Sequence, residues 1–173
     1  MAHIIMIVPP ERFRDEELFV TQEELEKAGH RITIASTRIG IIHGSRGESC
    51  ISEIELDDIN SKNYDAVVFV GGGGSKLLFA NKTALRIAKE MYKQNKVVAA
   101  ICLAPVILAN AGILNGKKAT VAGTEAKTLE KKGAIYTGPG VTVDGTIVTG
   151  NAPKASHLFG QQIANVLHQK EGL

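Results

Sequence analysis

Short apolar runs rich in Val, Ile and Ala alternate with amphipathic runs along almost the whole chain, and this alternation constrains the fold more than any other feature. The expected strands are 3–8, 31–35, 66–70 and 97–101, and the expected helices are 15–28, 84–93, 103–110 and 153–167. Strands separated by helices form mostly parallel sheets, because a parallel connection has to cross the sheet and a helix makes that crossing. We therefore predict an α/β fold, a three-layer sandwich whose mostly parallel sheet carries helices on both faces.

The rest of the chain is less regular. Residues 36–60 are rich in Gly and Ser, and we expect loops and short strands there. A strand is expected at 119–122 and a helix at 125–131, followed by a hairpin of 141–143 with 146–149. The Asp144-Gly145 dipeptide that joins the hairpin strands favours a tight primed turn. No repeat, low-complexity tract or linker divides the sequence, so residues 1–173 are expected to form a single domain.

The composition excludes several classes of function. Hydrophobic residues make up 44% and charged residues 22%, as in ordinary soluble globular proteins. Scattered charges with a net value of +2, 5% aromatics and no Trp argue against nucleic-acid binding. No apolar run reaches the roughly 18 residues of a membrane span, and the first residues do not resemble a signal peptide. We expect a cytoplasmic protein that binds no membrane, with its two cysteines as thiols and neither a metal nor a cofactor.

Cys102 stands where the expected strand 97–101 ends and a helix-like run begins. Ligands of doubly wound sheets bind beyond the carboxyl ends of the strands, which is where this thiol would lie. Ala100 and Ala104 flank it at two residues on either side, and small residues at these places suit a strand-to-helix turn that directs its central side chain outward. The pattern predicts a nucleophile elbow with cysteine as the nucleophile. The alternative is that Cys102 is a small hydrophobe, which is the preferred interpretation for Cys50.

Such an elbow has consequences for the thiol and its surroundings. Free backbone N–H groups and the helix dipole would stabilise a thiolate, so we expect a lowered pKa for Cys102. The N–H of Leu103 would face an oxyanion formed there, and the glycine run 71–74 offers a second donor through Gly72 or Gly73. The run lacks the Lys-Ser/Thr ending of a P-loop and the spacing of a dinucleotide fingerprint, so we interpret it as an oxyanion and packing turn.

Along nearly its whole length the sequence resembles the ThiJ/PfpI superfamily, the family of the Parkinson-disease protein DJ and of the PfpI intracellular peptidases. The motifs that carry the resemblance are FRDEEL, AGHRITIAS, YDAVVFVGG, VVAAICLAP, AGILNGKKAT and VTVDGTIVTG. The resemblance implies a flavodoxin-like fold of the class I glutamine amidotransferase type, an elbow cysteine at Cys102, and an acid, Glu17, that hydrogen-bonds the thiol. It also implies a homo-oligomer, either a dimer or a larger assembly.

If Glu17 faces Cys102, the site holds two groups that can each carry a negative charge. Two such charges repel in a partly desolvated site, so we expect the carboxyl to stay protonated and to donate to the thiolate.

The chain also departs from the family. PfpI-type peptidases place His directly after the nucleophile, where this chain has Leu103, and their partner-subunit acid falls near Lys76. The branch of the Parkinson-disease protein carries a His where this chain has Ala122. His43 and His157 are the plausible stand-in bases. The remaining histidines are expected to be structural or exposed: His3, His30 and His168.

Three functional hypotheses follow. The first is an enzyme of the glyoxalase or deglycase type, in which Cys102 attacks a small reactive carbonyl and Glu17 moves the proton. A PfpI-type peptidase or amidase is a weaker form of this hypothesis, because no His adjoins the nucleophile. The second is an oxidative-stress protein, a non-catalytic redox sensor or chaperone in which Cys102 is oxidised. The third is a protein whose elbow persists only as fold geometry.

Overall fold

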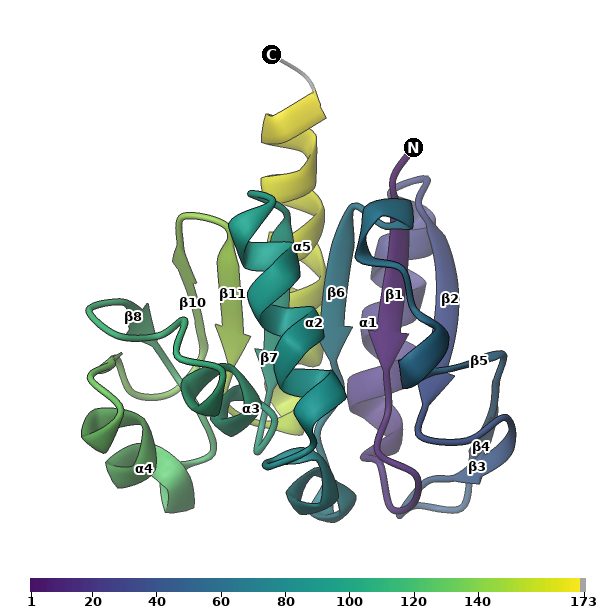
Figure 1. Cartoon of the computed structure of the whole chain (residues 1–173), viewed down its shortest axis with the longest axis horizontal. Coiled ribbons are helices and arrows are strands. Elements are labelled where there is room, and N and C mark those ends of the chain that lie inside the picture. Colours follow the sequence, from purple (N-terminus) through teal and green to yellow (C-terminus); the bar gives the residue numbers. More distant parts are fainter. Residues whose placement is uncertain (172–173) are drawn as a thin grey trace.

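The computed structural model describes residues 1–171 and is built around a seven-stranded sheet in the order β10-β11-β7-β6-β1-β2-β5 (Figure 1). Neighbouring strands from β11 to β5 are parallel, and β10 pairs antiparallel with β11. The strands are β1 (His3–Ile7), β2 (Arg31–Ser36), β5 (Ile54–Glu55), β6 (Ala66–Phe69), β7 (Val97–Ile101), β10 (Val141–Asp144) and β11 (Ile147–Gly150). The order β2-β1-β6-β7-β11 is the 2-1-3-4-5 arrangement of flavodoxin-like sheets, so the predicted fold class is confirmed.

Helices cover both faces of the sheet. In Figure 1, α2 and α3 lie in front of the sheet and α1 and α5 lie behind it. The helices are α1 (Asp15–Lys27), α2 (Lys82–Lys93), α3 (Pro105–Asn110), α4 (Ala126–Lys131) and α5 (Ser156–Glu171). Alternate residues of β1 enter different cores, with Ile5 and Ile7 on the α2 side and Ile4 and Met6 on the α1 side. Strands buried on both faces are apolar throughout, which is why the sequence shows them as continuous runs.

Several predicted elements differ from the structure. The helix expected at 153–167 is a 3₁₀ turn (Pro153–Ala155) followed by α5, which extends to Glu171. The helix after Cys102 begins at Pro105 and not at 103, because residues 102–104 form the turn. The strand expected at 119–122 is only β8 (Lys118–Ala119), which pairs with β9 (Ile135–Tyr136) in a separate small sheet. In the hairpin, Asp144 still pairs with Ile147, so the turn comprises residues 145–146, one residue later than predicted.

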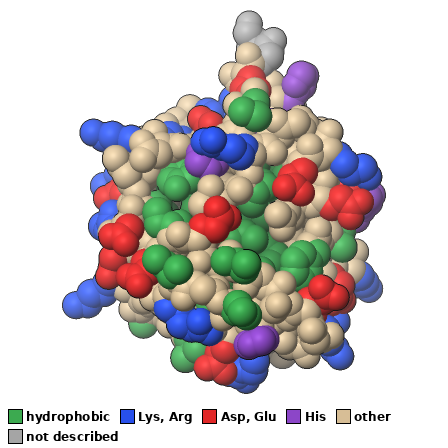
Figure 2. All heavy atoms as spheres, turned by 90° about the vertical axis from the view of Figure 1, so that its right-hand side faces the viewer, with side chains coloured by type: hydrophobic (Ala, Val, Ile, Leu, Met, Phe, Trp, Pro, Cys, Tyr) green, Lys and Arg blue, Asp and Glu red, His purple; other side chains and the backbone are tan. Residues whose placement is uncertain are grey.

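The segment 36–60 contains a hairpin of β3 (Gly40–His43) and β4 (Ser49–Ser52). It lies at the carboxyl edge of the main sheet, at the lower right of Figure 1. Ile41 and Ile51 face each other across the hairpin and are 56% and 64% exposed. Figure 2 shows the side of the molecule that carries this hairpin, where hydrophobic side chains gather among charged ones. Of the helices in residues 1–171, none combines the length and the apolar character needed to cross a membrane.

Candidate active site

Cys102 sits at a strained backbone turn directly after β7. Its φ of 64° lies in the left-handed region, which costs energy for any residue other than glycine. Two hydrogen bonds hold this conformation: the Cys102 N–H donates to the Gly150 carbonyl at 2.9 Å, and the Cys102 carbonyl accepts from the Ala122 N–H at 2.7 Å. The turn has the elbow geometry expected from the flanking alanines, and it leaves the thiol half-buried at the carboxyl edge of the sheet.

Gly71 brings the elbow and the first turn of α1 together. A Cβ on Gly71 would lie 2.9 Å from Cys102 Cβ and 2.5 Å from Glu17 Oε1, so only glycine fits without displacing one of them. Gly71 follows β6, Cys102 follows β7 and Glu17 follows β1. The three residues therefore meet where the strand order reverses between β1 and β6, which is the usual ligand position in this fold.

Glu17 is completely buried, with 0% of its surface exposed. Among residues 1–171, neither of its carboxyl oxygens has a well-formed hydrogen-bond partner. Burial raises the pKa of Glu17 to about 7, although the neighbouring Cys102 thiol and Gly71 N–H oppose that rise. The acid thus lies beside the thiol, as expected, with Gly71 packed on both, but no well-formed hydrogen bond joins the two groups within residues 1–171. The carboxyl is largely protonated below neutral pH and titrates near neutrality.

The prediction of a lowered pKa for Cys102 is wrong. Burial, and then the charge of Glu17, raise its pKa to about 12 against the opposing effects of the Leu103 N–H and the Arg14 guanidinium. Helix α3 begins three residues after the thiol and is six residues long, so its dipole is too small and too distant to outweigh desolvation. The acid and the thiol therefore carry at most one negative charge between them near neutral pH, and the pair resists taking a second.

Backbone N–H groups surround the elbow. The amides of Gly72 and Leu103 donate to no other group in the described part of the chain. Gly72 has a φ of 118°, and a Cβ there would meet the Arg12 carbonyl and the Arg14 N at 2.5 Å. The glycine run is therefore a packing turn against the loop after β1. Gly73 opens the short 3₁₀ helix that follows the run.

The structure brings neither proposed stand-in base to the thiol. His157 Nδ1 pairs with Glu24 Oε2 at 2.9 Å, and its side chain is 62% exposed. His43 is an exposed residue of β3, and its carbonyl accepts from the Arg12 N–H. No histidine is among the groups that shift the pKa of Cys102. Glu17 is left as the acid–base group in contact with the sulfur.

Two charged residues near the site were not singled out from the sequence. Arg14 binds Glu16 through two hydrogen bonds of 2.9 and 3.1 Å, and its charge favours ionisation of both Glu17 and Cys102. Asp15 is buried and binds a distant loop. The concentration of charges in FRDEEL was the available signal, but it did not reveal which of them are buried.

A groove of about 510 Å³ lies between the starts of α1 and α5. Arg14 and Val20 line one wall, and Ala152, Pro153 and His157 line the other.

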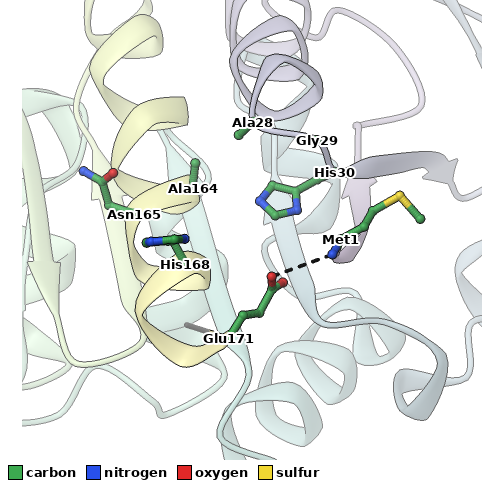
Figure 3. Close-up of a pocket in the computed structure, with 8 residues that line it drawn as sticks. All are labelled: Met1, Ala28, Gly29, His30, Ala164, Asn165, His168 and Glu171. Carbon is green, nitrogen blue, oxygen red and sulfur yellow. Dashed lines mark ion pairs between the residues drawn. The ribbon is translucent and has the colours of Figure 1, made fainter. Parts of the chain in front are cut away.

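Two other features lie away from the site. Cys50 is 8% exposed, and burial raises its pKa to about 11, which confirms its interpretation as a structural residue. A pocket of about 410 Å³ lies at the opposite, amino edge of the sheet, where Met1, His30, His168 and Glu171 meet (Figure 3). Within the described residues, no three His, Cys, Asp or Glu side chains are grouped as metal ligands.

A flavodoxin-like sheet with a cysteine at a strained elbow and a buried acid against it defines a class of α/β proteins, and comparisons with known proteins agree. The chain belongs to the DJ-1/PfpI family, whose model matches residues 2–166. It is 43% identical to an uncharacterized protein of Methanocaldococcus jannaschii over 97% of this chain and 83% of that protein. It is 31% identical to the deglycase PfpI of Pyrococcus furiosus over 94% and 98% of the two chains.

Among solved structures, a ThiJ/PfpI domain protein from Brachyspira murdochii superposes with a TM-score of 0.94. It is 31% identical in sequence, and the match covers 96% of each chain.

Proposed function

We propose that the protein is a cysteine-dependent enzyme of the glyoxalase or deglycase type that acts on small reactive carbonyls, with Cys102 as the nucleophile. The observation that carries this proposal is the contact between an outward-turned thiol and a buried carboxyl, Glu17, that has no other partner. Burying an unpaired acid is costly, and such groups cluster where chemistry requires them. Relatives named as deglycases support the same class of activity.

The first step requires only these two side chains. The ionised Glu17 carboxylate accepts the Cys102 thiol proton as the sulfur bonds to the aldehyde carbon of a 2-oxoaldehyde, which gives a hemithioacetal oxyanion. The N–H groups of Leu103 and Gly72 are the available donors for that oxyanion. A pKa of about 7 suits Glu17 to both accepting and returning a proton near neutral pH.

The later steps balance without a cofactor. The oxyanion is first protonated. The proton on the former aldehyde carbon then moves to the neighbouring carbonyl carbon, and the hydroxyl proton moves from the first oxygen to the second as the C=O bond changes place. The product is a thioester of a 2-hydroxy acid. Water then hydrolyses the thioester and frees Cys102, so one water and one 2-oxoaldehyde become one 2-hydroxy acid. Glu17 is the proton carrier in each transfer.

Peptide hydrolysis fits this site less well. An amine leaving group needs a proton donor beside the nucleophile, and the position that follows Cys102 is occupied by Leu103. His43 and His157 do not reach the thiol. The single carboxyl of Glu17 would therefore have to activate the nucleophile and also protonate the leaving amine.

A redox role is the second candidate, and the unpartnered carboxyl favours it as well. Hydrogen peroxide would transfer one of its oxygens to the Cys102 thiolate, which gives a sulfenic acid, and its other oxygen would leave as hydroxide. A protonated Glu17 could then donate a hydrogen bond to the added oxygen. This chemistry needs no histidine.

Methylglyoxal consumption tests the main proposal. We expect Cys102→Ser to lose about a thousandfold or more in kcat/KM, since the covalent step is removed. Cys50→Ser, which changes a thiol outside the site, is the matched control and should retain wild-type activity. Equal rates for the wild type and Cys102→Ser would refute the enzyme proposal.

Peptide mass spectrometry after mild peroxide treatment then tests the second candidate: oxygen added to Cys50 before Cys102 would refute the redox role.

A further inference from the structure

Asp15 is a buried carboxylate whose partners lie far away in the sequence. It is the first residue of α1 and only 5% exposed. Its Oδ1 accepts the N–H of Arg46 at 3.1 Å, and its Oδ2 accepts the N–H of Glu48 at 2.9 Å. Hydrogen bonds from backbone amides to a charged carboxylate are stronger than neutral ones. Asp15 therefore fastens the start of α1 to the turn of the β3–β4 hairpin.

The hairpin turn and the loop after β1 are tied together at further points. The Ser45 N–H donates to the Phe13 carbonyl at 2.8 Å, and the Arg12 N–H donates to the His43 carbonyl at 2.9 Å. Phe13 and Gly44 form an isolated parallel bridge. A Cβ on Gly44 would collide with the Asp15 carboxylate, so the glycine leaves the space in the turn that the carboxylate occupies.

The same loop is held from its other side by the glycine run. The Arg14 N–H donates to the Gly71 carbonyl at 2.9 Å, and Gly71 in turn packs on Cys102 and Glu17. Arg14, the N-cap residue of α1, makes no side-chain capping bond. The hairpin through Asp15 and the sheet through Gly71 thus fix the first turn of α1.

Glu17 depends on this bracing because no well-formed hydrogen bond within residues 1–171 fixes its carboxyl group. The Cys102 thiol and the Gly71 N–H lie beside the carboxyl group, but neither makes a well-formed hydrogen bond to it in the described chain. Its position follows from the backbone of the first turn, where the Glu17 N–H donates to the Arg14 carbonyl at 3.0 Å. A shift of that turn moves the carboxyl directly.

We propose that Asp15 is a positioning residue, which sets the distance between the Glu17 carboxyl and the Cys102 sulfur by locking the β3–β4 turn onto the first turn of α1. Its effect on catalysis rests on the function proposed above, whereas its effect on the ionisation of Cys102 does not.

The test is Asp15→Asn in a Cys50→Ser background, with the Cys102 thiol titrated by thiolate absorbance and by alkylation rate against pH. Asn has the same shape, but its amide nitrogen faces one of the two backbone N–H donors and repels it. Loosening the turn should let Glu17 retreat, so the midpoint of Cys102 ionisation should move to lower pH. The kcat/KM for methylglyoxal should fall about tenfold, mainly through kcat, because small displacements of reacting groups are costly.

The matched control is Asp65→Asn. Asp65 also accepts a backbone N–H from a distant segment, that of His3 at 2.8 Å, but at the amino edge of the sheet. Whatever stability this variant loses, its Cys102 titration is expected to stay unchanged. If the two variants leave the titration equally unchanged, or shift it equally, Asp15 has no special positioning role.

Gly44→Ala provides a second route, because it keeps Asp15 and crowds its carboxylate. It should shift the Cys102 titration in the same direction as Asp15→Asn, and a folded Gly44→Ala protein with the wild-type titration would overturn the proposal. If the titration shifts in both variants while Cys102→Ser retains activity, the positioning role stands and the proposed enzyme function fails.

Discussion

The two edges of the central sheet both gather ionisable groups, but they hold them differently. At the amino edge, the Met1 amine pairs with Glu171 at 3.7 Å, and His30 Nδ1 accepts the Ala2 N–H at 3.0 Å (Figure 3). At the carboxyl edge, Glu17 is buried without a hydrogen-bond partner in residues 1–171, beside a cysteine with positive φ. The amino edge pairs its Met1 amine and its His30 ring, whereas the carboxyl edge has backbone strain and an unpaired acid. Under the proposed function, strain and an unpaired acid mark the active edge, and the pocket at the amino edge does not.

After the loss of the thiol itself in Cys102→Ser, the largest expected effect is that of Gly71→Ala. The added methyl group would lie against both Glu17 and Cys102, so the acid and the thiol cannot keep their contact. Activity toward methylglyoxal should fall by about a hundredfold or more. Gly123→Ala is the control, since a Cβ there meets nothing within 4 Å. Similar activities for the two variants would mean that the contact between Glu17 and Cys102 is not needed.

Glu17→Gln should change how stability depends on pH. The wild-type carboxyl has a pKa raised from 4.5 to about 7 in the folded protein, so the folded state binds the proton more tightly than the unfolded state. The contribution of this carboxyl to the free energy of unfolding is therefore largest below pH 4.5, and it is lost as the pH rises through 7. The decrease amounts to about 3 kcal/mol and should be missing in Glu17→Gln. Urea unfolding at several pH values measures it, and parallel curves for the two proteins would contradict the burial of an ionising acid.

A smaller effect separates the two cysteines. Both thiols have raised pKa values, but Cys102 is half-buried and Cys50 is 8% exposed in the core behind the hairpin. Alkylation by iodoacetamide should modify Cys102 about tenfold faster than Cys50. Neither thiol ionises easily, so the rate is set mainly by how accessible each sulfur is to the reagent. Peptide mass spectrometry over time gives both rates. Faster modification of Cys50 would show that the hairpin opens more readily than the elbow.

The smallest effect belongs to the amino edge. His168→Gln alters an exposed wall of that pocket and removes no interaction on which the site depends. Its free energy of unfolding should stay within about 0.5 kcal/mol of the wild type, and methylglyoxal turnover should be unchanged. A marked loss of turnover would show that the two edges are coupled through α5.

The sequence was sufficient to predict the parallel sheet and the elbow, because both depend on local pattern. Val97 to Ile101 is apolar throughout, and alanines flank Cys102 at the required spacing. The start of α3 was misplaced although Pro105 at its first position was a usable signal.

The electrostatics of the site could not be predicted in the same way. The sign of the pKa shift of Cys102 depends on how deeply Glu17 and the thiol are buried together. That burial is produced by segments that are distant in the sequence, so no local pattern reveals it. The role of Asp15 was hidden for the same reason, since its partners lie 31 and 33 residues further along the chain.

The left-handed backbone at Cys102 has an evolutionary consequence. A cysteine there costs about 1 kcal/mol relative to glycine, so selection for stability alone would favour replacing it. A lineage that no longer needed the sulfur would be expected to drift to glycine at this position and become more heat-resistant as it lost its chemistry.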